Sequence, residues 1–135
     1  MIGLDTNALL RLLTGDDAAQ AALVRQRLAG FDAVPESVLL NHVVLVETLW
    51  TLRKLYDFKR EDLQSLMAQL LSASTFGFEN REVVVRALAL FNASSADFSD
   101  CLIAEQNAAL GCDTTVTFDK AMAGLPRVEL LRSNG

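Results

Sequence analysis

The sequence has few of the residues that build many familiar catalytic and structural sites. Among its 135 residues, histidine occurs once, at His42, and cysteine twice, at Cys101 and Cys112. A single histidine excludes sites built from several imidazoles and argues against a serine–histidine–aspartate hydrolase. The cysteines lack CxxC spacing and fall in one predicted helical segment. We therefore expect both to be reduced core residues of a cytoplasmic protein.

Long uncharged apolar runs are also missing. No stretch approaches the roughly 18 apolar residues that a membrane-spanning helix needs. The N-terminus has no basic region and carries Asp5 where a signal peptide would be apolar, so no secretory segment is expected. The composition is that of an apolar globular domain, with 51% hydrophobic and 21% charged residues. A mean hydropathy of +0.26 indicates that a partner or a second copy covers part of the surface.

Positive charge is in short supply as well. Twelve lysines and arginines stand against seventeen acids, which gives a net charge of −5. Taken alone, this balance argues against electrostatic binding of nucleic acid, which uses basic surfaces. It does not exclude a site in which metal ions supply the positive charge.

The pattern of apolar residues predicts strands that alternate with helices. A chain of 135 residues is most simply one domain, spanning residues 1–135. Alternation of this kind predicts an α/β fold with a mostly parallel sheet and helices on both faces. The predicted strands cover residues 2–4, 37–40, 75–79, 114–118 and 128–131. The predicted helices cover residues 8–13, 17–28, 42–56, 60–71, 80–91 and 100–110.

Glu47 is the most unusual acid in the sequence. It interrupts a predicted helix that is apolar nearly all round, so the helix should be buried on more than one side. An unpaired carboxylate in such a place costs several kcal/mol or more. Glu47 is therefore expected to be paired, protonated or bound to a cation. An ion pair with Arg11 or Arg53 is the alternative to a metal.

Three further acids lie where a predicted strand or linker ends and a helix begins: Asp5, Asp100 and Asp119. Each could be only a helix cap or a first-turn acid, and Asp97 competes with Asp100 for that role. In a parallel sheet these junctions all lie at the edge formed by the carboxyl ends of the strands. Carboxylates crowded there raise one another's pKa. Divalent cations relieve that repulsion, and carboxylates are the hard ligands that Mg²⁺ and Mn²⁺ prefer. Two such ions can clamp a phosphodiester.

Four segments carrying these acids, in this order, resemble motifs of the PIN-domain family, specifically the VapC-type toxin ribonucleases of toxin–antitoxin pairs. They are GLDTNALLR at 3–11, VLVETLWTLR at 44–53, ADFSDCLIA at 96–104 and VTFDK at 116–120. The resemblance spans nearly the whole chain. It implies a three-layer α/β/α sandwich around a short parallel sheet, with an acidic metal site.

The resemblance also implies the roles of individual residues. Asp5, Glu47 and Asp100 are then the core catalytic and metal-binding acids, and Asp119 is a more variable fourth. Asn7 and Thr117 occupy polar positions that support them. The implied activity is hydrolysis of RNA, single-stranded or structured and often tRNA or rRNA, with Mg²⁺ or Mn²⁺ as cofactor.

The implied partners are a second copy, forming a homodimer, and a small antitoxin that covers the active site. The departure from the family is the low pI and the scarcity of cations near the motifs. Arg11, Arg53 and Lys120 are the nearest candidates for phosphate contacts, although each is more simply explained as a solvated helix charge.

Two other functions compete with the ribonuclease. One is a PIN-like module that kept the acids but acts by binding a partner. The other is a phosphatase of the haloacid dehalogenase type, which also places an Asp after its first strand. That chemistry needs a second Asp two residues later, where this chain has Asn7, and it leaves Glu47 without a role.

Overall fold

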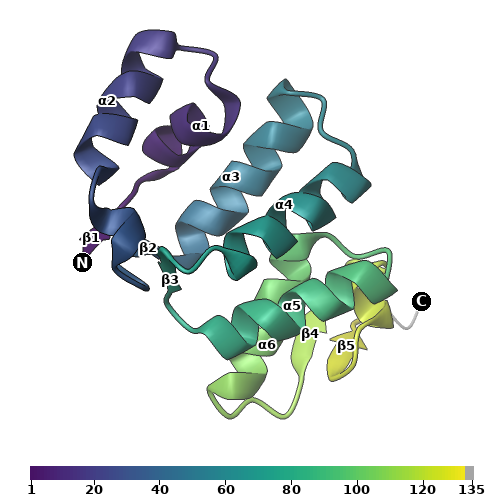
Figure 1. The fold of residues 1–135 in the computed structure, drawn as a ribbon. Coiled ribbons are helices and arrows are strands. Elements are labelled where there is room, and N and C mark those ends of the chain that lie inside the picture. Colours follow the sequence, from purple (N-terminus) through teal and green to yellow (C-terminus); the bar gives the residue numbers. More distant parts are fainter. Residues whose placement is uncertain (133–135) are drawn as a thin grey trace. The chain divides into compact units, whose positions relative to one another are not determined.

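The computed structural model describes residues 1–132, within which helices alternate with short parallel strands (Figure 1). Every strand pair in this part of the chain is parallel, so the predicted α/β class with a parallel sheet is confirmed. The chain divides into two compact units, one formed by Met1–Glu79 and the other beginning at Asn80. No helix in the described part is long and apolar enough to cross a membrane.

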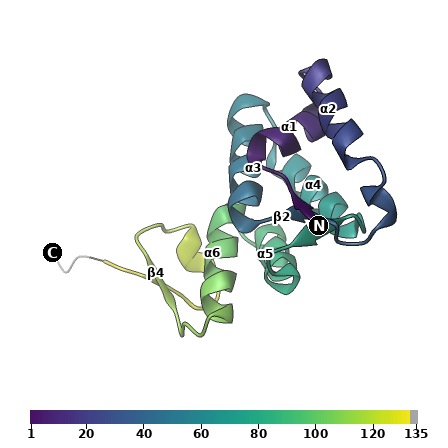
Figure 2. The ribbon, with the colours of Figure 1, turned by 90° about the vertical axis from the view of Figure 1, so that its left-hand side faces the viewer.

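The first unit is a three-stranded sheet with four α-helices (Figure 2). The strand order is β1-β2-β3, and Ile2 pairs with Val38, which in turn pairs with Phe76. The strands are β1 (Ile2–Gly3), β2 (Val38–Leu40) and β3 (Phe76–Phe78). The helices are α1 (Thr6–Thr14), α2 (Ala18–Leu28), α3 (His42–Leu55) and α4 (Arg60–Ser72), with a 3₁₀ turn, η1 (Phe31–Ala33).

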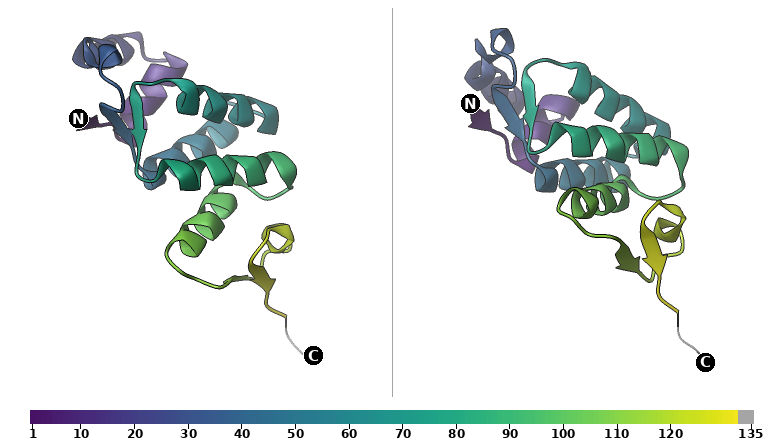
Figure 3. Two further views of the ribbon diagram at one scale, coloured as in Figure 1. Left: turned by 60° about the horizontal axis from the view of Figure 1, so that its bottom comes forward. Right: turned by 90° about the horizontal axis from the view of Figure 1, so that it is seen from below.

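The second unit pairs two helices with a two-stranded parallel sheet (Figure 3). The chain passes from α6 into β4 and returns through a 3₁₀ turn to β5. Phe91 on α5 and Phe98 on α6 meet edge to face, with ring centroids 5.9 Å apart. The elements are α5 (Arg81–Ala93), α6 (Phe98–Ala109), β4 (Thr115–Thr117), η2 (Met122–Gly124) and β5 (Val128–Leu130).

Helix α3 has one buried stripe rather than burial all round. Its buried residues follow the spacing of three and four that places side chains on one helix face: Val44, Leu45, Thr48, Leu49 and Leu52. Glu47 lies outside this stripe and is exposed, as are Val43 and Trp50. The prediction that Glu47 is buried is therefore wrong. Apolar residues on the outer face of α3 made the helix look buried on several sides.

The two cysteines differ from each other in the structure. Both are free thiols, as expected. Cys101 is fully buried in α6, whereas Cys112 is exposed and follows the end of that helix. The prediction that both are core residues of one helix is correct for Cys101 and wrong for Cys112. Helix α6 ends at Ala109, and Gly111 with positive φ leads the chain out of it.

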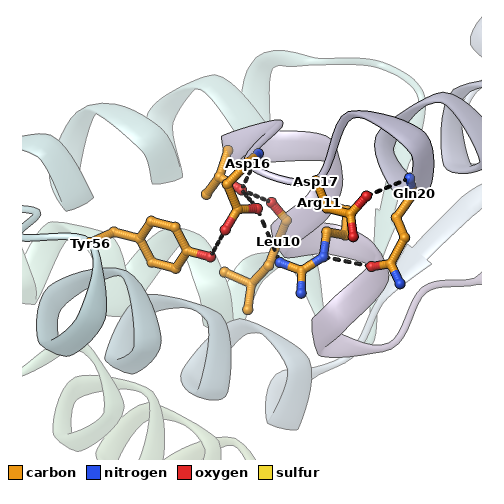
Figure 4. Close-up of polar contacts among 7 residues, drawn as sticks. Leu10, Arg11, Asp16, Asp17, Gln20 and Tyr56 are labelled. Carbon is orange, nitrogen blue, oxygen red and sulfur yellow. Dashed lines mark hydrogen bonds and ion pairs between the residues drawn. The ribbon is translucent and has the colours of Figure 1, made fainter.

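A polar network joins the ends of α1 and α3 (Figure 4). The chain reverses at Gly15, whose φ of 63° is in the left-handed region that favours glycine, and this turn presents Asp16. The Asp16 carboxylate accepts hydrogen bonds from the Tyr56 hydroxyl and from Arg11 Nη1 at 3.1 Å. The Thr14 hydroxyl lies 2.8 Å from Asp16 Oδ1. Hydrogen bonds from Tyr56 and Thr14, with the charge of Arg11, hold the pKa of Asp16 below its ordinary value.

Replacing Thr48 with valine should stabilise the protein. Thr48 is fully buried, and within residues 1–132 its hydroxyl oxygen has no hydrogen-bond partner. An unsatisfied buried polar group costs about 1–3 kcal/mol, and valine has nearly the same shape. We expect Thr48→Val to raise the free energy of unfolding by about 1 kcal/mol in urea titrations. Thr51→Val, at a half-buried position of the same helix, is the control. A loss of stability in Thr48→Val would show that the hydroxyl is satisfied.

Candidate metal centre

Asp5 stands between β1 and α1 and is held in place by the helix that it caps. Its Oδ1 accepts a hydrogen bond from the backbone N–H of Ala8 at 2.8 Å. The cap explains why the helix begins at Thr6, because one of the N–H groups left unpaired at a helix start is satisfied. A carboxylate offers two oxygens and about four lone-pair sites. Capping through Oδ1 is therefore compatible with metal binding through Oδ2.

Glu47 is linked to the start of α1 by a hydrogen bond. The Thr6 hydroxyl donates to Glu47 Oε1 at 2.7 Å, across 41 residues of sequence. Thr6 follows Asp5 directly, so this bond joins the two candidate acids of the first unit through one intervening side chain. The alternative of an ion pair between Glu47 and Arg11 does not hold, since the Arg11 guanidinium is engaged by Asp16 and by Gln20 at 2.7 Å.

Asp100 lies in the first turn of α6 rather than at its cap. The helix begins at Phe98 with Asp97 as its cap residue, so the prediction that the helix starts at Asp100 is wrong by two residues. Asp100 is half-buried. Burial, and then the negative charges of Asp119 and Asp97, raise the pKa of the Asp100 carboxyl above its ordinary value. The second unit therefore brings Asp100 and Asp119 close enough to repel each other.

Asp119 follows β4 and caps a turn, as its position after a strand predicts. Its Oδ1 accepts from the backbone N–H groups of Ala121 at 2.8 Å and Met122 at 3.4 Å. Its own N–H donates to the Thr117 hydroxyl oxygen at 3.0 Å. Thr117 thus fixes the backbone at Asp119. Asn7 lies exposed in the first turn of α1.

The four predicted acids fall into two pairs, one in each unit. Asp5 and Glu47 are joined through Thr6, and Asp100 and Asp119 interact electrostatically. Within residues 1–132, no three acidic, histidine or cysteine side chains are gathered closely enough to hold a metal by themselves. The donor chemistry nevertheless fits Mg²⁺ or Mn²⁺, because both pairs offer only hard carboxylate oxygens. Burial and then the charges of Asp119 and Asp97 raise the pKa of Asp100, and a cation would offset the part that comes from those charges.

The cations near the motifs differ in how strongly they are engaged. Arg11 is bound to Asp16 and Gln20, so its predicted role as a phosphate contact would require breaking that network. Lys120 is exposed next to Asp119. Arg53 is exposed in the last turn of α3. Both are more exposed than the half-buried Arg11.

Thr6 was not among the predicted supporting residues, although it contacts a predicted acid directly. In the sequence it is one of three consecutive residues, Asp5, Thr6 and Asn7, that all commonly cap helices. Only the position of α3 against α1 distinguishes it from Asn7, because that packing brings Glu47 within reach of Thr6.

Comparison with known proteins gives the class of the chain. The model of the PIN domain family matches residues 2–128, so the chain belongs to that family. The predicted resemblance and its α/β fold are confirmed.

Sequence comparison also finds a curated relative of the chain. It is a VapC ribonuclease from Aquifex aeolicus (strain VF5), 24% identical over 117 residues, which are 87% of this chain and 86% of the relative. No solved structure gives a significant match.

Replacing Asp100 with asparagine should stabilise the metal-free protein at neutral pH. A carboxyl whose pKa is raised in the folded state favours its protonated form there. Folding stability therefore falls as pH rises from the ordinary Asp pKa of 3.8 through the folded-state value. Asparagine removes this charge. In EDTA, we expect the two melting temperatures to be closest near pH 3.5 and Asp100→Asn to melt higher at pH 7. A lower melting temperature at pH 7 would contradict the raised pKa of Asp100 in the folded state.

Proposed function

We propose that the protein is a metal-dependent endoribonuclease that hydrolyses RNA phosphodiester bonds, the toxin component of a type II toxin–antitoxin pair. The observation that carries the proposal is the family match, which spans residues 2–128 and includes all four acids. The VapC ribonuclease relative supports the coarser class, a nuclease family of the toxin–antitoxin type. The match also spans both compact units, which supports one PIN-like domain over residues 1–135.

We assign Asp5, Glu47 and Asp100 as the core ligands of Mg²⁺ or Mn²⁺ and Asp119 as the fourth acid. A bound divalent ion supplies a Lewis acid for the phosphoryl oxygens and lowers the pKa of a water molecule. The residues of the chain hold and orient that centre. Asp5 and Asp119 use Oδ1 to cap their helical turns, which fixes the direction of the remaining carboxylate oxygen. Thr6 holds the Glu47 carboxylate, and Thr117 holds the backbone at Asp119.

The proposed partners are RNA, a small antitoxin and a second copy of the chain, in the cytoplasm. Val43 and Trp50 are apolar side chains on the outer face of α3, with exposed fractions of 65% and 61%. That face supports a homodimer or antitoxin contact. Net negative charge favours an RNA interaction in which metal ions, rather than a basic surface, meet the phosphates.

Replacing Asp5 with asparagine should abolish cleavage and leave the fold intact. Asparagine caps a helix as well as aspartate does, so the hydrogen bond from Ala8 is kept while the charge is lost. We expect the rate of RNA cleavage in Mn²⁺ to fall about 100-fold or more, as for other groups that stabilise charge at a reaction centre. The melting temperature in EDTA should change little.

The matched control for this substitution is Asp17→Asn. Asp17 caps α2 by accepting from the N–H of Gln20, so the control loses the same charge at the same kind of position. It should retain activity. Full chelator-sensitive cleavage by Asp5→Asn would rule out the assignment. Stabilisation of the wild type by Mn²⁺ without any cleavage would favour the partner-binding module.

Replacing Thr6 with valine should weaken metal binding without removing a ligand. Groups that orient a metal ligand typically change affinity 10- to 100-fold when lost, and this hydroxyl orients Glu47. We expect the Mn²⁺ dissociation constant of Thr6→Val to rise about 10-fold in calorimetric titration. Thr6→Ser keeps the hydroxyl and should restore most of the affinity. Equal affinities of Thr6→Val and Thr6→Ser would show that the bond plays no part in the site.

A further inference from the structure

Helices α1 and α3 are joined by polar contacts at two places. At one, Thr6 at the start of α1 donates to Glu47. At the other, Tyr56, which follows the last residue of α3, donates to Asp16 just beyond the end of α1. Both helices therefore run in the same direction. Both helices contribute buried leucines, Leu9 and Leu10 on α1 and Leu45, Leu49 and Leu52 on α3. The two helices are in contact with each other.

The contact at Asp16 is built from several elements. Arg11 comes from α1, Asp16 from the turn after it and Tyr56 from the end of α3, while Gln20 of α2 holds the other side of Arg11 (Figure 4). The Thr14 hydroxyl has one hydrogen, and it lies within reach of both Asp16 Oδ1 and the Leu10 carbonyl oxygen, at 2.8 and 2.7 Å. The arrangement ties α1 to the end of α3 through the Asp16 carboxylate and to α2 through the hydrogen bond from Arg11 to Gln20.

This network is too exposed to be explained by stability alone. The Arg11 and Asp16 side chains have exposed fractions of 26% and 43%. Ion pairs at such positions contribute little to folding, because water and salt screen them. A hydrogen bond of this kind still biases the direction of a helix, by as much as its own free energy. The effect of the bond would then be on the orientation of α1 relative to α3. Orientation matters most where side chains from two helices bind one metal ion.

The candidate acids are attached rigidly to the two helices that the network joins. Asp5 is fixed to α1 by its cap on Ala8, and Glu47 is part of α3. Helix α1 has nine residues, so its two ends are about 12 Å apart at the usual rise per residue. A tilt of roughly 10° about the Asp16 end would move Asp5 by about 2 Å. Metal–ligand distances hold within about 0.2 Å, so such a tilt would disrupt coordination.

We propose that Asp16 and Tyr56 are positioning residues for the metal centre. Their hydrogen bond holds α1 at the angle to α3 that keeps the Asp5 and Glu47 carboxylates in register for one divalent cation. The inference rests on the proposed function, because it takes Asp5 and Glu47 as ligands. It adds a role for side chains at the opposite end of the helix pair.

The test measures Mn²⁺ affinity of the full chain by calorimetric titration, together with the melting temperature in EDTA. Tyr56→Phe removes only the hydroxyl, and Asp16→Asn removes the acceptor charge. We expect each to raise the Mn²⁺ dissociation constant about fivefold, the lower end of coupling between distant sites. The double variant should be no weaker than the weaker-binding single variant, because one hydrogen bond is lost only once. Melting temperatures in EDTA should stay within a few degrees of the wild type.

Glu82→Gln is the matched control. It removes the carboxylate charge of another exposed ion pair, with Arg86 at 3.4 Å, in the second unit. It should bind Mn²⁺ as the wild type does. Unchanged affinity in Tyr56→Phe and Asp16→Asn would overturn the proposal, as would a fall in melting temperature with no change in affinity. If Asp5→Asn binds Mn²⁺ as tightly as the wild type, the metal assignment itself fails, and the positioning role fails with it.

Discussion

The hydrogen bond from Thr6 to Glu47 is the constraint on which the candidate centre of the first unit depends. It connects an acid that caps the first helix to an acid 41 residues beyond Thr6, through a hydroxyl that can donate to only one acceptor at a time. Its length of 2.7 Å is typical of a bond to a charged oxygen. Because Asp5 and Glu47 belong to different helices, their relative position is set by the packing of α1 on α3. Every feature that fixes this packing therefore also acts on the proposed metal site.

Local pattern was sufficient to predict the elements and the capping positions of Asp5 and Asp119. The sequence around Leu4, Asp5 and Thr6 shows a strand, then an acid, then a helix. The same order of elements around Asp119 predicts that this residue follows a strand and begins a helical turn. These features depend on neighbours within a few residues, such as the cap from Asp5 to Ala8. Parallel pairing also followed from local information, because strands separated by helices have room only for crossover connections.

Features that depend on which helix face is buried could not be predicted in the same way. Glu47 was expected to be buried because its neighbours are apolar, but α3 buries only the stripe through Leu45, Leu49 and Leu52. The start of α6 was misplaced because Asp97 and Asp100 are equally good cap residues by type, and only the fold decides between them. The contact between Asp16 and Tyr56 joins residues 40 apart, and neither lies in a recognisable motif.

Repulsion between carboxylates links the stability of the protein to its proposed cofactor. In the second unit, burial and then the charges of Asp119 and Asp97 raise the pKa of Asp100, so the ionised state that a metal requires is also a state that the metal-free fold disfavours. A cation that binds the folded state reverses this balance, and the gain grows with its concentration relative to the dissociation constant. An excess of acidic over basic side chains is then compatible with a substrate that carries phosphate groups, because bound cations separate the two negative charges. In the metal-free protein the acidic side chains would repel RNA. With Mg²⁺ or Mn²⁺ bound, the same side chains would hold positive charge at the place where a phosphodiester has to lie.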